Sequence, residues 1–512
     1  MNKARSKNKN FAIISFFLLL ILLITTGCYP NTTQEKTPTI TRTTVENTPT
    51  PAIQQPPEPS SIPDEIIEQE STPTDFYTTP PSYNISVVFD YSTQSANIEQ
   101  KIQYVNNSSF ELSEIRLACD SLRYPNSFSI LNATINTEND IEFIEEDYYL
   151  SIVLGEPLLP GKEIEIQIDY LLSVPPLPPP ADDKKPGIFG YSAVQTNFVD
   201  WYPFIPPIDN EGNWVLHEPW FYGEYLVYDL ANFEIEIELV NTLPETQIAA
   251  STLPKAQKDN RYMYESTLAR NFVWSISPSY VVESQKLDGI TITTYTFPFH
   301  QQAGTHVLNE ATKAIELYSR LFTSYPRENL TIVEGDFLDG MEYDGLFFLG
   351  RGYFNLFDYT PQNYLTFIAA HETAHQWWYA SIANDQAIDP WLDEALCTYS
   401  EILFYEEYYP ELIDWWWEYR VNYYQPDGFI NKPIYDYNGF IPYRNATYLQ
   451  GAKFLENLRN DLGDSSFFKL IKEYATTQQN EISSEEYFLQ LIKNYSGQNP
   501  FTTYPEYFQP RE

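Results

Sequence analysis

The chain has 512 residues, and its 70 acidic side chains against 30 basic ones give a formal net charge of −40. A chain this acidic is repelled by nucleic acid and by anionic membrane surfaces, which argues against both as partners and favours cationic substrates. Its 3 cysteines do not indicate a disulfide scaffold, although a bridge between Cys119 and Cys397 stays open.

The first 28 residues have the pattern of an export signal. Four Lys or Arg residues among the first nine positions precede an apolar run, Phe11–Ile24, that is short for a membrane span. The run ends in Thr-Thr-Gly27-Cys28, which resembles a bacterial lipobox. Residues 1–28 are therefore predicted to be a lipoprotein signal peptide. Lipidated Cys28 would anchor the protein to a membrane in the cell envelope, outside the cytoplasm; the alternative is an uncleaved signal anchor.

Two different patterns follow the signal. Residues 29–80 are rich in Thr, Pro, Ser and Glu, so they bury too little surface to offset ordering entropy and are predicted to form a disordered linker. From 81 to 285 the pattern changes to period two. Ile164–Tyr170 and Phe233–Leu239 alternate strictly between apolar and polar residues, as half-buried antiparallel strands do. We expect one all-β sandwich or saddle domain here.

A second domain is expected over residues 286–495, followed by a C-terminal tail at 496–512. It opens with a strand-like stretch, Ile290–Thr296, continues through a helix around Asn309–Phe322, and has a further strand at Leu330–Val333. The chain beyond that strand is mainly helical in pattern.

Two neighbouring helices are predicted in the middle of this domain. Thr360-Pro361 supplies an N-cap and a first-turn proline, so we predict a helix over Pro361–Ile382. Asp389-Pro390 repeats the same signal for the next helix. Because the connection is short, the two helices should pack antiparallel.

These helices carry candidate metal ligands. His371 and His375 stand at i and i+4, so both imidazoles lie on one helical face and can bind one Zn²⁺. Glu372 points about 100° away around the helix, beside the metal, where its carboxylate can act as a general base. Glu394 in the second helix is placed to be the third ligand, which leaves a position open for water, as in catalytic zinc sites. The alternative is a pair of surface histidines on an ordinary helix.

The wording of these motifs resembles the aminopeptidase N family of gluzincin zinc metallopeptidases. That family places eighteen residues between its HExxH and the glutamate ligand, as between His375 and Glu394 here. HETAHQW and WLDEA are similar to the family's HELAHQW and WLNEG. The resemblance implies the α+β class, with an all-β domain before a thermolysin-like, mainly helical catalytic domain that contains a small sheet. It also implies one zinc ion per chain and peptide substrates.

A segment upstream of the metal motif resembles the family's exopeptidase signature, often GAMEN. It reads Asp-Gly340-Met341-Glu342-Tyr. The resemblance implies that Gly340, Met341 and Glu342 bind the substrate, with the carboxylate paired to the terminal ammonium. The alternative is a solvated glutamate in a turn.

A segment downstream resembles the helix start that carries the family's catalytic tyrosine. It reads Asn445-Ala-Thr-Tyr448, with Gly451 close behind. Tyr448 is thereby implied to donate a hydrogen bond to the oxyanion of the tetrahedral intermediate. Tyr448 also continues an apolar stripe and could simply pack there, and Tyr443 is the other candidate.

Together these features predict a zinc-dependent aminopeptidase that removes N-terminal residues from peptides at the bacterial cell surface. A zinc endopeptidase with the same chemistry is one alternative, and a catalytically silent peptide-binding or adhesion lipoprotein is another. The large C-terminal helical domain of many family members is not expected in this chain, so peptides larger than dipeptides should enter more easily. The other histidines, His217, His300 and His306, show no ligand spacing and are expected on the surface or in loops.

Overall fold

The computed structural model describes residues 79–136, 143–178 and 187–509, all within one compact unit, Asp75–Glu512. The predicted signal peptide, Cys28 and the linker up to residue 78 lie outside the described residues. Among the described helices, none combines the length and the apolar character that crossing a membrane requires. Cys119 and Cys397 are both buried and free, so no bridge joins them.

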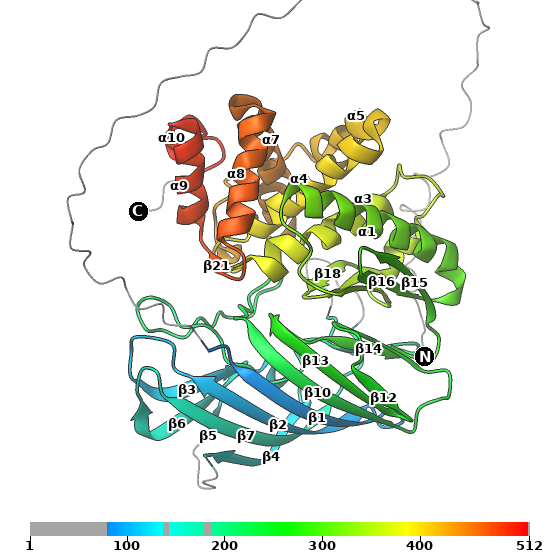
Figure 1. Cartoon of the computed structure of the whole chain (residues 1–512), viewed down its shortest axis with the longest axis vertical. Helices are drawn as coiled ribbons and strands as arrows, with labels where there is room; N and C mark the ends of the chain where they lie inside the picture. Colours follow the sequence, from blue (N-terminus) through cyan, green and yellow to red (C-terminus); the bar gives the residue numbers. More distant parts are fainter. Residues whose placement is uncertain (1–78, 137–142, 179–186, 510–512) are drawn as a thin grey trace, which may run out of the picture. The chain divides into compact units, whose positions relative to one another are not determined.

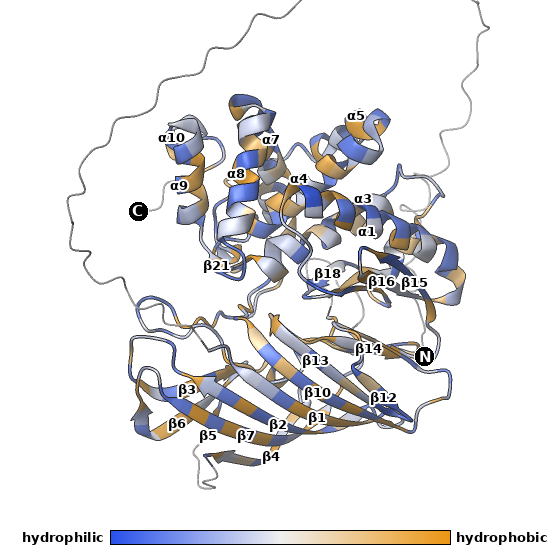
Figure 2. Cartoon of the chain, viewed as in Figure 1, coloured by the Kyte–Doolittle hydropathy of each residue, from blue (hydrophilic) through white to orange (hydrophobic). Residues whose placement is uncertain are grey.

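A seven-stranded sheet dominates the N-terminal half of the described chain (Figure 1). Hydrophilic and hydrophobic residues alternate along its strands, because one face is buried and the other meets water (Figure 2). In sheet order the strands are β12 (Ala256–Lys258), β13 (Arg261–Ala269), β10 (Ala231–Val240), β1 (Ser82–Asp90), β2 (Ser95–Val105), β7 (Glu163–Ser173) and β4 (Phe128–Ile135).

Two smaller sheets belong to the same half. One has the order β11 (Gln247–Ala250), β14 (Trp274–Ser277), β9 (Thr196–Phe198) and β8 (Gly190–Tyr191). The other has the order β3 (Leu112–Ala118), β6 (Tyr149–Leu158) and β5 (Phe143–Glu145).

The two strictly alternating stretches lie in β7 and β10, as predicted. β7 pairs antiparallel with β2 and β4. β10 pairs antiparallel with β13 but parallel with β1, where Ser82 lies opposite Asn232. The prediction of antiparallel pairing is therefore wrong for this one ladder. More than a hundred residues separate β1 from β10, and so long a connection permits parallel pairing, which a tight hairpin cannot.

A five-stranded sheet connects the β half with the helices. Its order is β15 (Val281–Leu287), β16 (Ile290–Thr296), β17 (Asn329–Gly335), β19 (Leu346–Gly350) and β18 (Gly340–Tyr343). Leu346 and Phe348 of β19 pack into the core of the N-terminal sheets, whereas Phe347 and Leu349 pack into the core of the helices. Because neighbouring side chains point to opposite faces of a strand, this sheet is covered on both faces.

Helices make up most of the remaining chain, which confirms the predicted α+β class. They are α1 (Gln301–Leu321), α2 (Arg351–Asn355), α3 (Tyr364–Ala374), α4 (Trp391–Tyr408), α5 (Ile413–Trp416), α6 (Phe440–Arg444), α7 (Gly451–Leu462), α8 (Asp464–Thr477), α9 (Glu485–Ser496) and α10 (Pro500–Thr503). Short 3₁₀ or π turns are η1 (Asp120–Arg123), η2 (Pro298–His300), η3 (Gln376–Ser381), η4 (Pro410–Leu412), η5 (Trp417–Val421), η6 (Asn422–Tyr424), η7 (Ile434–Asp436) and η8 (Asn445–Gln450). β20 (Ala383–Asn384) pairs with β21 (Ile482–Ser483).

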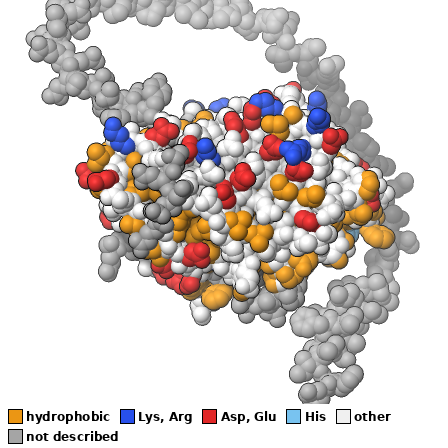
Figure 3. Space-filling view, turned by 90° about the horizontal axis from the view of Figure 1, so that it is seen from below, with side chains coloured by type: hydrophobic (Ala, Val, Ile, Leu, Met, Phe, Trp, Pro, Cys, Tyr) orange, Lys and Arg blue, Asp and Glu red, His pale blue; other side chains and the backbone are white. Residues whose placement is uncertain are grey.

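The end of the described chain packs into the helical core. Phe508, in the stretch that was predicted as a tail, contacts the rings of Trp391 and Phe454. On the face shown in Figure 3, acidic side chains are scattered among hydrophobic and basic ones.

The first motif helix is shorter than predicted. α3 begins at Tyr364, and its N-cap is Asn363, whose side chain accepts a hydrogen bond from the N–H of Thr366. The α-helix ends at Ala374, and the predicted run to Ile382 is wrong. Residues 376–381 instead form a kinked π turn, in which side chains bond to neighbouring elements rather than continue a regular helix.

Candidate active site

The predicted zinc ligands come together between α3 and α4. The two helices are antiparallel, because Tyr405 near the end of α4 donates to the carbonyl of Pro361 before α3, whereas Glu394 at the start of α4 lies beside His371. Nε2 of His371 and Nε2 of His375 lie 3.2 and 3.7 Å from Oε2 of Glu394. All three side chains are buried, and one ligand atom from each lies within 4.8 Å of the others. Two imidazoles and a carboxylate in this arrangement fit a zinc ion.

A buried network orients His371. Its Nδ1 lies 2.9 Å from Oε1 of Glu401. The Glu401 carboxylate also accepts hydrogen bonds from the side chain of Arg420 and, at Oε2, from Nε1 of Trp416. Burial acts to raise the pKa of Glu401, but Arg420 and His371 hold it below its ordinary value. An ionised carboxylate only accepts, so Nδ1 of His371 carries the hydrogen and Nε2 keeps its lone pair for a metal. Glu401 lies two turns after Glu394 on α4, a spacing from which the sequence could have indicated it.

Glu372 points into the same hollow. Its Oε2 is buried without a hydrogen-bond partner among the described residues. Burial and the neighbouring carboxylates of Glu342 and Glu394 raise the pKa of Glu372 well above its ordinary value. A Cβ at Gly340 would come within 2.1 Å of Oε1 of Glu372, so the glycine leaves the room that this carboxylate occupies.

Tyr448 reaches the ligands from η8. Its hydroxyl donates a hydrogen bond to Oε1 of Glu394, and its ring stacks on that of His371 with the centroids 5.9 Å apart. Burial and Glu394 raise the pKa of Tyr448 well above its ordinary value, so the phenol remains a proton donor. Tyr443 lines the same cavity and packs edge-on against Tyr448, but no hydrogen bond joins its hydroxyl to a described ligand residue.

Glu342 approaches the metal ligands from the sheet. It lies in β18, opposite Phe347 of β19, and is 4% exposed. Oxygens of Glu342 and Glu372 lie within 4.8 Å of each other and of a nitrogen of His375. Nε2 of Gln386 donates to Oε1 of Glu342 at 3.2 Å and to Oδ2 of Asp393 at 2.6 Å. Gln386 thus connects the strand with the helix that carries Glu394.

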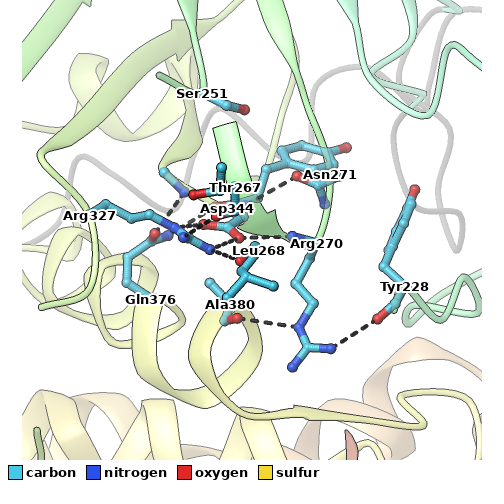
Figure 4. Close-up of polar contacts among 12 residues, drawn as sticks. Tyr228, Ser251, Thr267, Leu268, Arg270, Asn271, Arg327, Asp344, Gln376 and Ala380 are labelled. Carbon is cyan, nitrogen blue, oxygen red and sulfur yellow. Dashed lines mark hydrogen bonds and ion pairs between the residues drawn. The ribbon is translucent and has the colours of Figure 1, made fainter. Parts of the chain in front are cut away.

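The turn between β18 and β19 is held by several polar contacts (Figure 4). Oε1 of Gln376 accepts from the N–H of Gly345, and its Nε2 donates to the carbonyl of Tyr343, both at 2.9 Å. Asp344 accepts from the side chain of Arg327 and from the backbone N–H of Arg270. Gln376 directly follows His375. Its two hydrogen bonds therefore fix the position of the metal-binding segment relative to the strand that carries Glu342.

The metal ligands, Glu372, Tyr448, Gly340 and Glu342 all line one cavity of about 710 Å³. Met341 does not line it, because alternate side chains of β18 point to opposite faces. Glu224 also lines this cavity, from a loop of the β half, and is half-buried. Neither Glu224 nor Gln386 was predicted, since no local pattern distinguishes a single Glu or Gln in a loop.

The three remaining histidines lie outside the ligand set. His217, His300 and His306 bond to the side chains of Asp385, Glu334 and Thr366 respectively. All three are half-buried, so the expectation that they lie on the surface or in loops is wrong for His306, which belongs to α1.

Fold and site together define the class of protein, a metallopeptidase. Residues 306–502 match the sequence profile of the Peptidase family M1 domain. The family implies zinc, in agreement with the donor set.

Known proteins share parts of this sequence. Aminopeptidase M1-D of Oryza sativa subsp. japonica is 26% identical over 205 residues, which are 37% of this chain and 23% of that protein. Endoplasmic reticulum aminopeptidase 2 of Homo sapiens is 27% identical over 202 residues, 36% of this chain and 21% of that protein. The chain thus matches less than a quarter of the length of these curated relatives.

Solved structures share the fold over most of the chain. An M1 zinc metallopeptidase from Deinococcus radiodurans has a TM-score of 0.58 at 17% identity and covers 85% of this chain and 94% of its own. A mutant two-domain M1 zinc metallopeptidase bound to L-arginine has a TM-score of 0.61 at 16% identity, with 84% and 95% covered.

Proposed function

We propose that this chain is a zinc-dependent aminopeptidase, which hydrolyses the first peptide bond of its substrates. The M1 domain and the aminopeptidase relatives support the peptidase class. The observation that carries the aminopeptidase form is the buried carboxylate of Glu342 beside Glu372. A carboxylate that lines the cavity beside the metal ligands can pair with a cation there, and the free ammonium of a substrate's first residue is one. Glu224 on the same cavity can accept a second hydrogen bond from that ammonium.

Zinc, held by His371, His375 and Glu394, would polarise the scissile carbonyl and lower the pKa of a water molecule. Glu372 takes the proton of the attacking water and returns it to the leaving amine. Tyr448 donates a hydrogen bond to the oxyanion that forms on the carbonyl.

The test uses the full-length protein and chromogenic aminoacyl reporters, each made with a free and with an acetylated amine. Free-amine reporters should be cleaved, a chelator should stop cleavage, and added zinc should restore it. Acetylation removes the charge that Glu342 binds, so acetylated reporters should be cleaved far more slowly.

Two alternatives predict different results. An endopeptidase would cut internal bonds of acetylated peptides as fast as it trims free ones. A catalytically silent peptide-binding protein would bind peptides and cleave none of them. The presence of all three ligands together with Glu372 and Tyr448 supports an active enzyme over a silent one.

We further propose that the enzyme is a lipoprotein of the bacterial cell envelope, anchored through Cys28. The basic start, the apolar run Phe11–Ile24 and Gly27-Cys28 support this. Cys28→Ala should abolish the incorporation of labelled fatty acid and change the processing of the precursor. Unchanged lipid labelling in the variant would refute the anchor.

A further inference from the structure

One positively charged side chain lines the metal cavity. Among the described residues that line it, Arg444 at the end of α6 is the only Lys or Arg, whereas five are Asp or Glu. Arg444 is half-buried, and a guanidinium keeps its charge at any pH at which a protein works. The catalytic steps described above give this charge no role.

The charge of Arg444 is not neutralised within the protein. Most described arginines form ion pairs with carboxylates. Among the described residues, Arg444 has no such partner. Its Nη2 donates to Oδ1 of Asn445 at 2.7 Å, and its guanidinium lies over the ring of Tyr424, 4.1 Å from the centroid. Burial lowers the pKa of Arg444, and no carboxylate is among the groups that act to raise it.

Arg444 lies one helical turn from the catalytic tyrosine. Phe440, Arg444 and Tyr448 follow one another at intervals of four residues, and all three line the cavity. The hydroxyl of Tyr448 donates to Glu394, one of the metal ligands. Because one turn advances the chain by about 5 Å, Arg444 lies close to the metal ligands without touching them.

The face of α3 that lines the cavity shows in which direction Arg444 lies. Tyr364, His371 and His375 all line the cavity. His375, at the end of the helix, lies beside Glu342, where the proposed function places the substrate's ammonium. Tyr364, at the start of the helix, interacts electrostatically with Arg444. The residues that follow the scissile bond should therefore extend toward Arg444.

The available length fits a short peptide. Tyr364 precedes His371 by seven residues, which correspond to about 10 Å along a helix. Two or three extended residues beyond the scissile bond span about 7 to 10 Å. Leu356, Ile368 and Ile441 also line the cavity and offer apolar surface to these residues. The last residue of a tripeptide or tetrapeptide would thus come to Arg444.

We propose that Arg444 binds the C-terminal carboxylate of short peptides, so that the enzyme prefers tripeptides and tetrapeptides with a free carboxyl end. The inference rests on the aminopeptidase function and specifies its substrates. A guanidinium can hold a carboxylate through parallel N–H···O bonds. Arg444 also offsets the repulsion that the acidic side chains of the cavity exert on the negative end of a peptide.

The test measures kcat/KM of the full-length enzyme for peptides that start with leucine and continue with glycine, from the dipeptide to the hexapeptide. Each peptide is made as the free acid and as the amide. Amidation removes the negative charge and changes little else, so the ratio of acid to amide isolates the carboxylate. We expect a ratio of about tenfold or more for the tripeptide and tetrapeptide, a smaller one for other lengths, and a decrease with added salt.

Three variants test the role of Arg444. Arg444→Gln should bring the ratio close to one, because the positive charge is lost. Arg444→Lys keeps a charge without the planar fork, so an intermediate ratio is expected. Lys453→Gln is the matched control, because it removes a positive charge from α7 that does not line the cavity. This control should leave the ratio unchanged.

The outcomes separate this inference from the proposed function. If neither the peptides nor the aminoacyl reporters are cleaved, the aminopeptidase function fails, and the inference fails with it. If peptides are cleaved but acids and amides react equally at every length, the aminopeptidase function stands and the role of Arg444 is refuted.

The variants give further ways to refute it. A ratio that persists in Arg444→Gln would mean that another group binds the carboxylate. If Arg444→Gln does not fold, an unchanged ratio in Arg444→Lys overturns the proposal instead. A peptide amide that ends in aspartate carries only a side-chain carboxylate, and its cleavage as fast as the free acid would overturn the assignment to the chain end.

Discussion

The metal cavity has two walls that differ in how they are built. The helix wall, from α3 and α4, carries the three ligands and Glu372, and a buried network through Glu401 holds His371. The strand wall, from β18 and the loop at Glu224, carries carboxylates that reach the cavity from distant parts of the chain. Under the proposed function, the helix wall performs the chemistry for every substrate, and the strand wall decides which substrates are positioned for it.

The largest effect should follow from a change in the helix wall. Glu372→Gln removes the general base but keeps the shape of the side chain, so turnover of every reporter should fall by about 100- to 10,000-fold. The zinc content, measured by atomic emission, should stay at one ion per chain, because Glu372 is not a ligand. Full activity in this variant would remove Glu372 from the mechanism.

A change in the strand wall should act selectively. Glu342→Ala should cost roughly 2 to 4 kcal/mol of transition-state stabilisation toward free-amine substrates, since the substrate ammonium would lose its partner. Glu342→Gln, which keeps the volume, separates charge from packing. Cleavage of acetylated reporters, slow in the parent enzyme, should not slow further in either variant. An equal loss for free and acetylated reporters would break the division between the two walls.

Glu401, the carboxylate that orients His371, should affect zinc binding more than substrate binding. Glu401→Gln weakens the acceptor that orients His371, so zinc affinity should fall by about 10- to 100-fold. Competition with a chromogenic chelator measures this affinity. Glu406→Gln on the same helix, whose partner is Arg459 rather than a zinc ligand, is the matched control and should leave zinc affinity unchanged.

The smallest effect is expected where the two walls are joined. Gln386→Leu removes two hydrogen bonds that the neutral amide donates, one to Glu342 and one to Asp393. Each lost hydrogen bond should cost about 1 kcal/mol. The loss should be seen mainly as a raised KM for free-amine reporters. Zinc content should not change. A loss of zinc in this variant would show that Gln386 supports Glu394 and the helix wall rather than the position of Glu342.

Local sequence patterns were enough to predict many of the strands and the metal ligands. The alternation in Ile164–Tyr170 predicted a strand that exists, because one buried face imposes period two. The i, i+4 spacing of His371 and His375 predicted two ligands on one face, because helix geometry is local. The same reasoning failed at the end of α3, where contacts of Gln376 and Trp378 with other elements replace the helix that propensity favours.

The remaining cavity residues are brought into place by contacts between segments that are distant in the sequence. The sequence contains Glu224 and Gln386, but nothing in their neighbourhoods distinguishes them from other polar residues of loops and turns. Their importance comes from packing, which brings a loop of the β half and the side chain of Gln386 to the cavity that the metal ligands and Glu342 line. The metal ligands could be inferred from their spacing in the sequence, because two neighbouring helices carry all three of them. Substrate selection could not be inferred, because it depends on which side chains long-range folding places around the first residue of a peptide.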